Sequence, residues 1–385
     1  MASFLGVFLQ ELKTIFSDRR IYIIMLCGPF FYGILFGGVY LNGRVRQVGT
    51  VIIDQDHSAL SREFINDVRA ADSLHIVALS QTESDFAKYV KRGDAYICLV
   101  VPHDFEHDIA KGKQVTIAVL TDGSNLLISN VTVKSISVVI TTFGTRARMK
   151  RLMMGGVPKS SLMSEAAPIQ AEFRPLFNPS YNYSAYLLIG LVCIALQQVT
   201  MLGASISLSQ DNSNERRRQL RQVCKSPFIA LLGKASAHAM IMVPLSFGGA
   251  YVPFGLFHCP YHGAWSVMLA STAIFVIVQI FAGFGVAGIC KRPLLSAQVL
   301  LILSVPLFML TGATWPVCAM PEFLQCLAYA IPLTHFVSIT RQASLVGASA
   351  ALLSQHFVVI AIWIPIALLW AYWAVRRMFL QSFGN

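Results

Sequence analysis

Six long apolar runs constrain the fold of this chain more than any other feature. A helix needs about 20 apolar residues to cross the hydrocarbon core of a bilayer, and few soluble domains contain even one such run. The chain is 55% hydrophobic and only 13% charged, with a mean hydropathy of +0.60. The predicted spans are Ile21 to Leu41, Tyr186 to Leu208, Ile229 to Phe257, Gly263 to Ile289, Leu295 to Val317 and Phe357 to Val375.

The third span is the least regular of the six, because it contains Lys234, His238, Pro244 and Pro253. We expect Lys234 to extend its ammonium group from the membrane toward the cytoplasmic surface. Before the first span, "FLGVFLQELKTIF" has the apolar spacing of a helix, with Glu11 and Lys13 away from the apolar side. Such a helix is expected to lie on the membrane surface.

Basic residues of short loops concentrate on the cytoplasmic side of membrane proteins, and this rule orients the spans. If both termini lie in the cytoplasm, most of the cations of the short loops lie there too. They are Lys13, Arg19, Arg20, Arg216, Arg217, Arg218, Arg221, Lys225, Lys291, Arg292, Arg376 and Arg377. This topology also accounts for the net charge of +11, since the cations are dispersed among apolar spans. A nucleic-acid-binding face, by contrast, would concentrate them.

Between the first two spans lies a stretch with alternating strand and helix patterns. "VGTVIID", "SLHIVAL", "AYICLVVP" and "VTIAVLTDG" have the composition of strands, with helical patterns between them and a long helix from about Leu126 to Met154. The sequence therefore predicts an α-helical polytopic membrane protein with six transmembrane helices and an inserted extracytoplasmic α/β domain. The predicted parts are 1–41 (surface helix and first span), 42–183 (α/β domain) and 184–385 (five spans).

Enzymatic signatures are weak. Asp54 and Asp56 in "VIIDQDHS" follow a strand, as in some phosphatases, but Asp56 or Ser58 is equally suited to cap the next helix. No G-x-x-x-x-G-K-[ST] loop occurs, so ATP is not expected to bind by that route. We predict no catalytic residues and no metal site. Cys318 and Cys326 could form a disulfide if they face an oxidising compartment, although two free thiols are favoured.

Glutamines inside the spans are candidates for a translocation path, because polar groups in hydrocarbon are costly. Hydrogen bonding between helices is the alternative role. The residues concerned are Gln197, Gln198, Gln279 and Gln298. No Asp or Glu lies deep in a predicted span, which argues against proton-coupled or sodium-coupled transport.

Two segments outside the spans carry the most specific patterns. "NERRRQLRQVCKSPF" forms most of a basic loop, 209–228, and "TGATWPVCAMPEFLQCLAYAIPLTHFV" follows the fifth span. With the surface helix and "FNPSYNYSAYLLIGL", these segments resemble the ABC-2 family of ATP-driven export permeases, over nearly the whole chain. In that family the second segment forms re-entrant helices, here 313–337, with Gly312, Pro316, Pro321 and Pro332 at their turns.

The resemblance implies that the 209–228 loop docks onto a separate ATPase subunit. The residues implied are Glu215, Arg216, Arg217, Arg218, Leu220, Arg221, Val223 and Pro227. Leu220 and Val223, three residues apart, are expected to share a face toward that partner. The loop departs from the family pattern, with Arg218, Gln219 and Arg221 where glycine, threonine and glutamate are typical. This departure suggests pairing with a second permease that carries the standard loop.

The resemblance further implies a non-enzymatic transport subunit of the bacterial inner membrane. It binds no cofactor directly, since ATP and magnesium belong to the ATPase, and it pairs with an identical or different permease chain. Its substrates are expected to be amphiphiles such as drugs or lipid-like molecules. The large outer domain is expected to be a docking platform for a periplasmic export partner or a substrate gate. The alternative is a membrane-anchored sensor or scaffold without transport.

Overall fold

The computed structural model describes residues 2–41, 45–80, 82–158, 160–166, 176–177, 183–290 and 292–380. These residues form two compact units, Met1–Gly43 with Pro175–Asn385, and Arg44–Arg174. We call them the helical unit and the strand-containing unit. Residues 178–182 of "FNPSYNYSAYLLIGL" and Lys291 lie outside the described residues.

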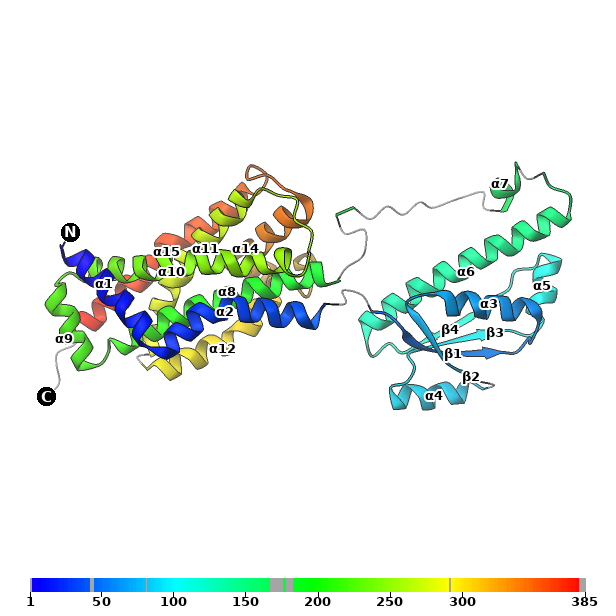
Figure 1. Cartoon of the computed structure of the whole chain (residues 1–385), viewed down its shortest axis with the longest axis horizontal. Helices are drawn as coiled ribbons and strands as arrows, with labels where there is room; N and C mark the ends of the chain where they lie inside the picture. The colour runs from blue at the N-terminus through cyan, green and yellow to red at the C-terminus, as the bar shows by residue number, and fades with distance from the viewer. Residues whose placement is uncertain are drawn as a thin grey trace. The chain divides into compact units, whose positions relative to one another are not determined.

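The helical unit is a bundle of long apolar helices with shorter helices at its ends (Figure 1). Its long helices are α2 (Arg19–Val39), α8 (Tyr183–Gln210), α10 (Pro227–Gly255), α11 (Trp265–Cys290), α12 (Pro293–Leu310) and α15 (Ser354–Leu380). The shorter ones are α1 (Ala2–Ser17), α9 (Asn214–Val223), a 3₁₀ turn (Val317–Ala319), α13 (Glu322–Ala330), α14 (Pro332–Arg341) and a π-helical turn (Gln342–Val346).

Helix α8 lies at the centre of this unit, packed against α2, α10, α11, α12 and α14. Small residues let the backbones approach closely, as in membrane helix packing. A Cβ atom on Gly283 of α11 would lie 2.6 Å from the carbonyl oxygen of Met201 in α8. By contrast, α12 leaves most of its apolar surface exposed, including Leu301, Ile302 and Val305.

The strand-containing unit has a four-stranded sheet in the order β2-β1-β3-β4 (Figure 1). Strands β1 and β2, and β1 and β3, are parallel, whereas β3 and β4 are antiparallel. The strands are β1 (Val48–Asp54), β2 (Leu74–Ser80), β3 (Ile97–Val101) and β4 (Ala118–Thr121), and the helices are α3 (Ala59–Ala70), α4 (Glu83–Arg92), α5 (Phe105–Lys111), α6 (Leu126–Met154) and α7 (Leu162–Ala166). All four predicted strands are confirmed.

Both faces of the sheet are covered, which explains why its central strands are apolar at nearly every position. Ile52 and Leu99 face a core that includes α3, α5 and α6, where Phe143 of α6 packs edge-on against Phe64 at 5.2 Å. Val51 and Cys98 point to the other face, where Phe86 and other residues of α4 pack. The predicted long helix is confirmed as α6.

Gly49 in β1 provides a direct test of this packing. A Cβ atom there would lie 1.9 Å from the backbone carbonyl oxygen of Asp94, and this segment cannot move aside cheaply because the backbone N–H of Tyr96 donates to the carbonyl oxygen of Gly49 at 2.8 Å. We expect Gly49→Ala to destabilise the strand-containing unit by about 1–3 kcal/mol, the usual cost of overpacking, or more. Limited proteolysis of the full chain should then cleave this unit faster. Gly123→Ala, where no atom lies within 4 Å of the added Cβ, is the matched control.

By length and hydropathy, seven of the described helices could cross a membrane: α2, α6, α8, α10, α11, α12 and α15. Six of them belong to the helical unit and coincide with the predicted spans, while α6 belongs to the strand-containing unit. One predicted boundary was wrong. The fifth span was expected to reach Val317, but α12 ends at Leu310 because the chain turns through Gly312 with a positive φ of 77°.

Candidate functional site

The basic window of the 209–228 loop forms the helix α9, immediately after the end of α8. Its predicted docking residues are not equally accessible. Glu215, Arg218 and Val223 are exposed, Arg216, Arg221 and Pro227 are half-buried, and Arg217 and Leu220 are buried. The exposed surface of this segment also includes Gln219, Gln222 and Lys225. We call the exposed residues Glu215, Arg218, Gln219, Gln222 and Lys225 the α9 surface.

Leu220 does not face outward. It is 4% exposed and belongs to the hydrophobic core of the helical unit, and Val223, three residues on, lies close to Gly6 of α1. Leu220 was expected to face a partner protein, but it packs against other residues of its own chain. The reason is that α1 packs beside α9 and offers apolar surface of its own.

A chain of polar contacts connects α9 to the first long helix. Arg216 donates from Nη1 to Oε1 of Gln210 at 2.7 Å, and Gln210 donates from Nε2 to Oδ2 of Asp18 at 2.7 Å. Asp18 is the N-cap of α2, where its other oxygen accepts from the backbone N–H of Arg20 at 2.9 Å. The half-buried Arg216 is thus a structural contact between α9, α8 and α2.

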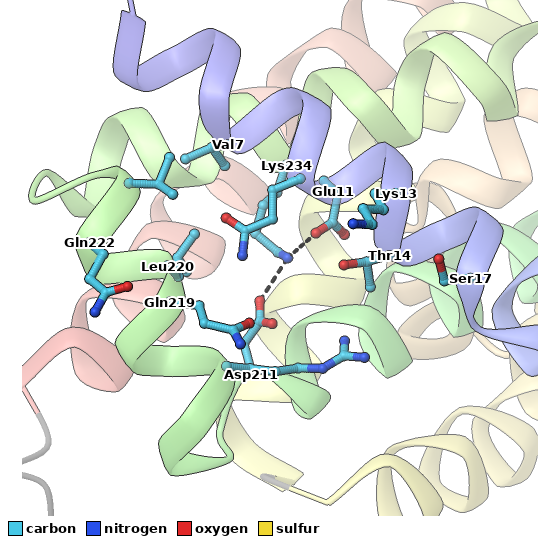
Figure 2. Close-up of a pocket in the computed structure, with 13 residues that line it drawn as sticks. Val7, Glu11, Lys13, Thr14, Ser17, Asp211, Gln219, Leu220, Gln222 and Lys234 are labelled. Atoms are coloured by element: carbon cyan, nitrogen blue, oxygen red, sulfur yellow. Dashed lines mark hydrogen bonds and ion pairs between the residues drawn. The ribbon is translucent and has the colours of Figure 1, made fainter.

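A pocket of about 420 Å³ opens between α1 and α9 (Figure 2). Glu11 of α1, Asp211 after α8 and Lys234 of α10 line it, and Lys234 lies between the two carboxylates. Its Nζ is 2.7 Å from Oδ2 of Asp211 and forms a second ion pair with Glu11. These three side chains are buried, at 9% exposure or less.

Glu11 has two more buried partners. His238, one helical turn after Lys234, places Nε2 2.9 Å from Oε1 of Glu11, and the hydroxyl of Ser207 in α8 donates to the same oxygen. A carboxylate only accepts, so the His238 Nε2 carries the proton in this contact. We call Glu11, Asp211, Lys234 and His238 the ionic cluster. It connects α1, the end of α8 and α10.

Burial affects the two carboxyl groups of the cluster differently. It would raise the pKa of Glu11, but the Lys234 ammonium and the contacts with His238 outweigh it and hold that pKa well below its usual range. Asp211 has fewer compensating contacts. Its burial, helped by the nearby Glu11 carboxylate, raises its pKa despite Lys234 and Arg216. Two carboxylates sharing one ammonium leave a negative charge in excess, which explains why one of them retains its proton more readily.

This cluster corrects the expectation for Lys234. The sequence predicted that its ammonium would reach the membrane surface, but the side chain is 2% exposed and ion-paired inside the unit. Glu11 was also placed away from the apolar side of its helix, yet it is buried between Val7 and Ile15 on the face that packs against α10. One signal was present in the sequence: Lys234 and His238, one turn apart in an apolar run, require an acidic partner.

Asp211→Asn should be tolerated, because it leaves Glu11 and Lys234 as a balanced pair. The raised pKa of Asp211 means that its contribution to stability is complete below its unfolded value of 3.8 and is lost as pH rises through the higher folded value. The variant should therefore gain stability relative to the unmodified chain as pH increases above 3.8. Thermal unfolding of the detergent-solubilised protein at a series of pH values would measure this. A constant difference across the series would contradict it.

The four glutamines predicted for a translocation path differ in their exposure. Gln197 and Gln198 of α8 and Gln279 of α11 are buried, whereas Gln298 lies exposed on α12. Gln198 lines a largely apolar groove of about 290 Å³ with residues of α2 and with Leu301 of α12. Its Nε2 atom is buried without a hydrogen-bond partner.

The segment 313–337 contains two short helices with a sharp break. Pro316 and Pro321 precede the 3₁₀ turn and α13, and Pro332 begins α14. The helices Glu322–Ala330 and Pro332–Val346 are bent by 80° relative to each other, as in a broken span or a re-entrant loop. Cys318 and Cys326 in this segment are both exposed free thiols.

Gly312, at the turn before this segment, is held by two side chains. The hydroxyl of Tyr186 and Nη1 of Arg341 each lie 3.5 Å from its carbonyl oxygen, and the Arg341 guanidinium stacks on the Tyr186 ring at 4.2 Å. Tyr186 is near the first residue of α8, whereas α9 follows its last. Tyr186 and Gln210, the last residue of α8, are about 36 Å apart at 1.5 Å per residue. The 313–337 segment and α9 therefore lie at opposite ends of the helical unit.

Asp54 makes hydrogen bonds within the turn that follows β1. Its Oδ1 accepts from the backbone N–H groups of Asp56 and His57, each at 3.1 Å, and its Oδ2 accepts from the Ser61 hydroxyl at 2.8 Å. Ser58 caps α3 by accepting from the Ser61 N–H. These bonds fix the turn after β1. Among the described residues, no group of three or more His, Cys, Asp or Glu side chains could hold a metal ion.

Comparisons with known proteins agree on one family. Residues 19–375 match the model of the ABC-2 family transporter protein. The inner membrane transport permease YhhJ of Escherichia coli K12 is 21% identical over 358 residues, covering 91% of this chain and 90% of YhhJ. The probable multidrug ABC transporter permease YbhR of the same organism is 20% identical over 346 residues, covering 88% and 89%.

A third relative is similar over a shorter region. The linearmycin resistance permease protein LnrN of Bacillus subtilis 168 is 29% identical over 103 residues, 27% of this chain and 26% of LnrN. The family match covers α2 through most of α15, so it includes the long apolar helices, the strand-containing unit, α9 and the 313–337 segment. The resemblance seen in the sequence is thereby confirmed, and the chain belongs to the ABC-2 family of transporter proteins.

Proposed function

We propose that this chain is the membrane-spanning permease subunit of an ABC exporter that moves amphiphilic molecules outward across the inner membrane of a bacterium. The observation that carries the proposal is the family match over 19–375, which includes both α9 and the apolar helices that surround α8. ABC-2 proteins of this kind are transport subunits and not enzymes, so hydrolysis of ATP belongs to a separate subunit.

The proposed transmembrane topology depends on which of the apolar helices cross the bilayer. The six long helices of the helical unit cross the bilayer, whereas α6 covers the sheet with Ile136 and Phe143 and stays with the strand-containing unit. An even number of spans keeps both termini on one side. The basic residues of α9, with Arg19, Arg20, Arg376 and Arg377, support a cytoplasmic location for that side. The strand-containing unit and the 313–337 segment are then outside it.

The ATPase subunit docks on the α9 surface. This surface combines a first-turn acid, Glu215, with Arg218 and Lys225, and its two glutamines can bond with backbone or side-chain groups. Guanidinium groups form strong bidentate contacts with carboxylates. ATP and magnesium bind to the partner, and the closing of the ATPases pushes on α9. The partner is therefore expected to present an acidic surface.

The cargo is an amphiphile. The groove beside Gln198 is mainly apolar, formed by α2, α8 and α12, and has a single buried amide that can hydrogen-bond with a polar group of the cargo. The names of YbhR, a probable multidrug permease, and LnrN, a linearmycin resistance permease, fit this class of substrate. The exposed apolar surface of α12 is where a second permease chain, identical or different, would pack. The outer α/β unit serves as a gate or as a platform for a periplasmic partner.

Affinity purification of the full chain from its native membrane tests the proposal. An ATPase subunit should co-purify, and ATP hydrolysis by the complex should be inhibited by vanadate. Purification of the chain with no ATPase under mild detergent would contradict the proposal and favour a sensor or scaffold. Membrane-impermeant labelling of single cysteines placed in α9 and in β2 would test the topology, because the two should react from opposite sides.

A further inference from the structure

The ionic cluster is an unusual feature of a membrane helix bundle, because it buries two carboxylates, one ammonium and one imidazole beside apolar helices. Its members come from three separate parts of the chain: Glu11 from α1, Asp211 from the end of α8, and Lys234 and His238 from α10. Lys234 and Glu11 are 223 residues apart. Contacts between neighbouring residues of one helix therefore do not explain why these side chains meet.

Stability alone does not explain such a cluster. Replacing a buried ion pair by apolar side chains of similar size is often neutral or stabilising, since the desolvation of the charges offsets their attraction. Ion pairs and hydrogen bonds do have direction, however, and they fix the relative position of the groups that they join. Here they fix α1 and the end of α8 on one residue of α10, Lys234.

The neighbouring contacts strengthen the same connection. Gly233, next to Lys234, brings α10 so close to α1 that a Cβ atom would lie 2.9 Å from Cγ1 of Val7. Asp211 also directly follows Gln210, which carries the polar chain from Arg216 to Asp18. Two adjacent residues at the end of α8, next to α9, are thus linked to different helices, Gln210 to the N-cap of α2 and Asp211 to α10.

Helix α9 contacts α1 beside the pocket. Figure 2 shows the space between α1 and α9, with Lys234, Glu11 and Asp211 joined along one side. The two helices touch at Gly6 and Val223, where a Cβ atom on Gly6 would lie 2.8 Å from Cγ1 of Val223, and an open pocket of about 420 Å³ lies beside this contact. The connection to α10 is different, because its members are buried and ion-paired.

We propose that Glu11, Asp211 and Lys234 are positioning residues that transmit movement of α9 to α10, so that ATPase closure reaches the far end of the helical unit. This inference rests on the proposed function, in that it requires an ATPase docked on α9. It assigns the cluster a role in coupling and none in docking, since its members are buried beneath the α9 surface.

The test uses the complete transporter with its ATPase, reconstituted in lipid nanodiscs. The variant is Glu11→Gln with Asp211→Asn and Lys234→Met, which removes all three charges together and leaves no unpaired ion. Cys318 and Cys326 are exposed thiols in the 313–337 segment, and they report movement there through their reaction with a water-soluble maleimide. Cys27, also exposed, is replaced by Ser throughout.

In the unmodified complex, trapping with ATP and vanadate should change the labelling rate of these thiols. In the charge-free variant we expect the ATPase to remain bound and to hydrolyse ATP, while the trapping-dependent change falls by about fivefold or more, as for the loss of an ordinary coupling energy. Lys234→Arg, which keeps the charge, should retain most of the change. Asp85→Asn with Lys88→Met removes an exposed ion pair of the strand-containing unit and should have no effect.

Three results would overturn the inference. The first is a full trapping-dependent change in the charge-free variant, and the second is a loss of ATPase binding in that variant, which would make the cluster part of docking. The third is an unmodified complex in which trapping with ATP and vanadate leaves the labelling rate of the thiols unchanged. If the charge-free variant does not elute as a single folded species, Glu11→Gln with Lys234→Met is measured in the same way. Failure to bind any ATPase in the unmodified chain would instead refute the proposed function.

Discussion

Lys234→Met should lower the free energy of unfolding of the helical unit by about 3–5 kcal/mol, the usual cost of removing one partner of a buried ion pair. The methionine fills most of the space of the lysine, so packing is nearly preserved. Its effect is electrostatic: Glu11 and Asp211 remain buried, close together and without their shared counter-ion. Thermal unfolding in detergent and the yield of monodisperse protein would measure the loss, which is a large share of ordinary stability.

Two comparisons separate charge from packing in this experiment. Glu11→Gln with Lys234→Met should recover much of the loss, because only Asp211 then remains, and its pKa is already raised. Lys88→Met breaks an ion pair of the same length, 2.7 Å, but Lys88 is 68% exposed and the pair is screened by water. It should change stability little. Equal losses for Lys234→Met and Lys88→Met would show that burial of the cluster does not matter.

Reversal of the exposed cations near α9 should weaken ATPase association by about tenfold or more, which corresponds to about 1.4 kcal/mol. The variant is Arg218→Glu with Lys225→Glu, and both side chains are exposed. They are better targets than Arg216 and Arg217. Arg216 contacts Gln210 and Arg217 is buried, so changes there would also disturb the fold. Quantitative co-purification at two salt concentrations would show the effect, which should be larger at low salt.

The matched control places the same change in charge on the other unit. Lys91→Glu with Arg92→Glu reverses two exposed cations at the end of α4 and should leave ATPase association unchanged. If the α9 variant bound the ATPase as well as the control, docking would have to occur on a different surface, and the assignment of the α9 surface would be wrong. Weaker binding with both variants would indicate a dependence on net charge only.

The sequence was sufficient for most of the secondary structure. Apolar runs of membrane length correspond to α2, α8, α10, α11, α12 and α15, and alternation with β-branched residues located β1 to β4. Ser58 was expected as a candidate cap of α3 and is one. These features depend on neighbours a few residues apart, which is why pattern alone finds them. The early end of α12 was missed, because Gly312 adopts a positive φ that hydropathy does not register.

The candidate site was predicted less well. The sequence located the basic segment of α9 and the broken segment 313–337, and the family match covers both. It could not tell which side of α9 is available, because Leu220 belongs to the same buried core as Val7 of α1, more than 200 residues away in the chain. For the same reason, the sequence led us to expect that the Lys234 ammonium reaches the membrane surface. Each face of a helix packs against a different neighbouring helix, and hydropathy alone does not identify those neighbours.

Length, hydropathy and the placement of cations by themselves predicted that this chain is a membrane protein of many helices, with an inserted strand-containing stretch and a basic loop after the second span. Only the tertiary structure decided that Glu11, Asp211, Lys234 and His238 meet inside the helical unit. The physical reason is that a charge in an apolar environment needs a counter-charge within a few ångströms. That distance is set by how α1, α8 and α10 pack together, and no stretch of sequence contains all three.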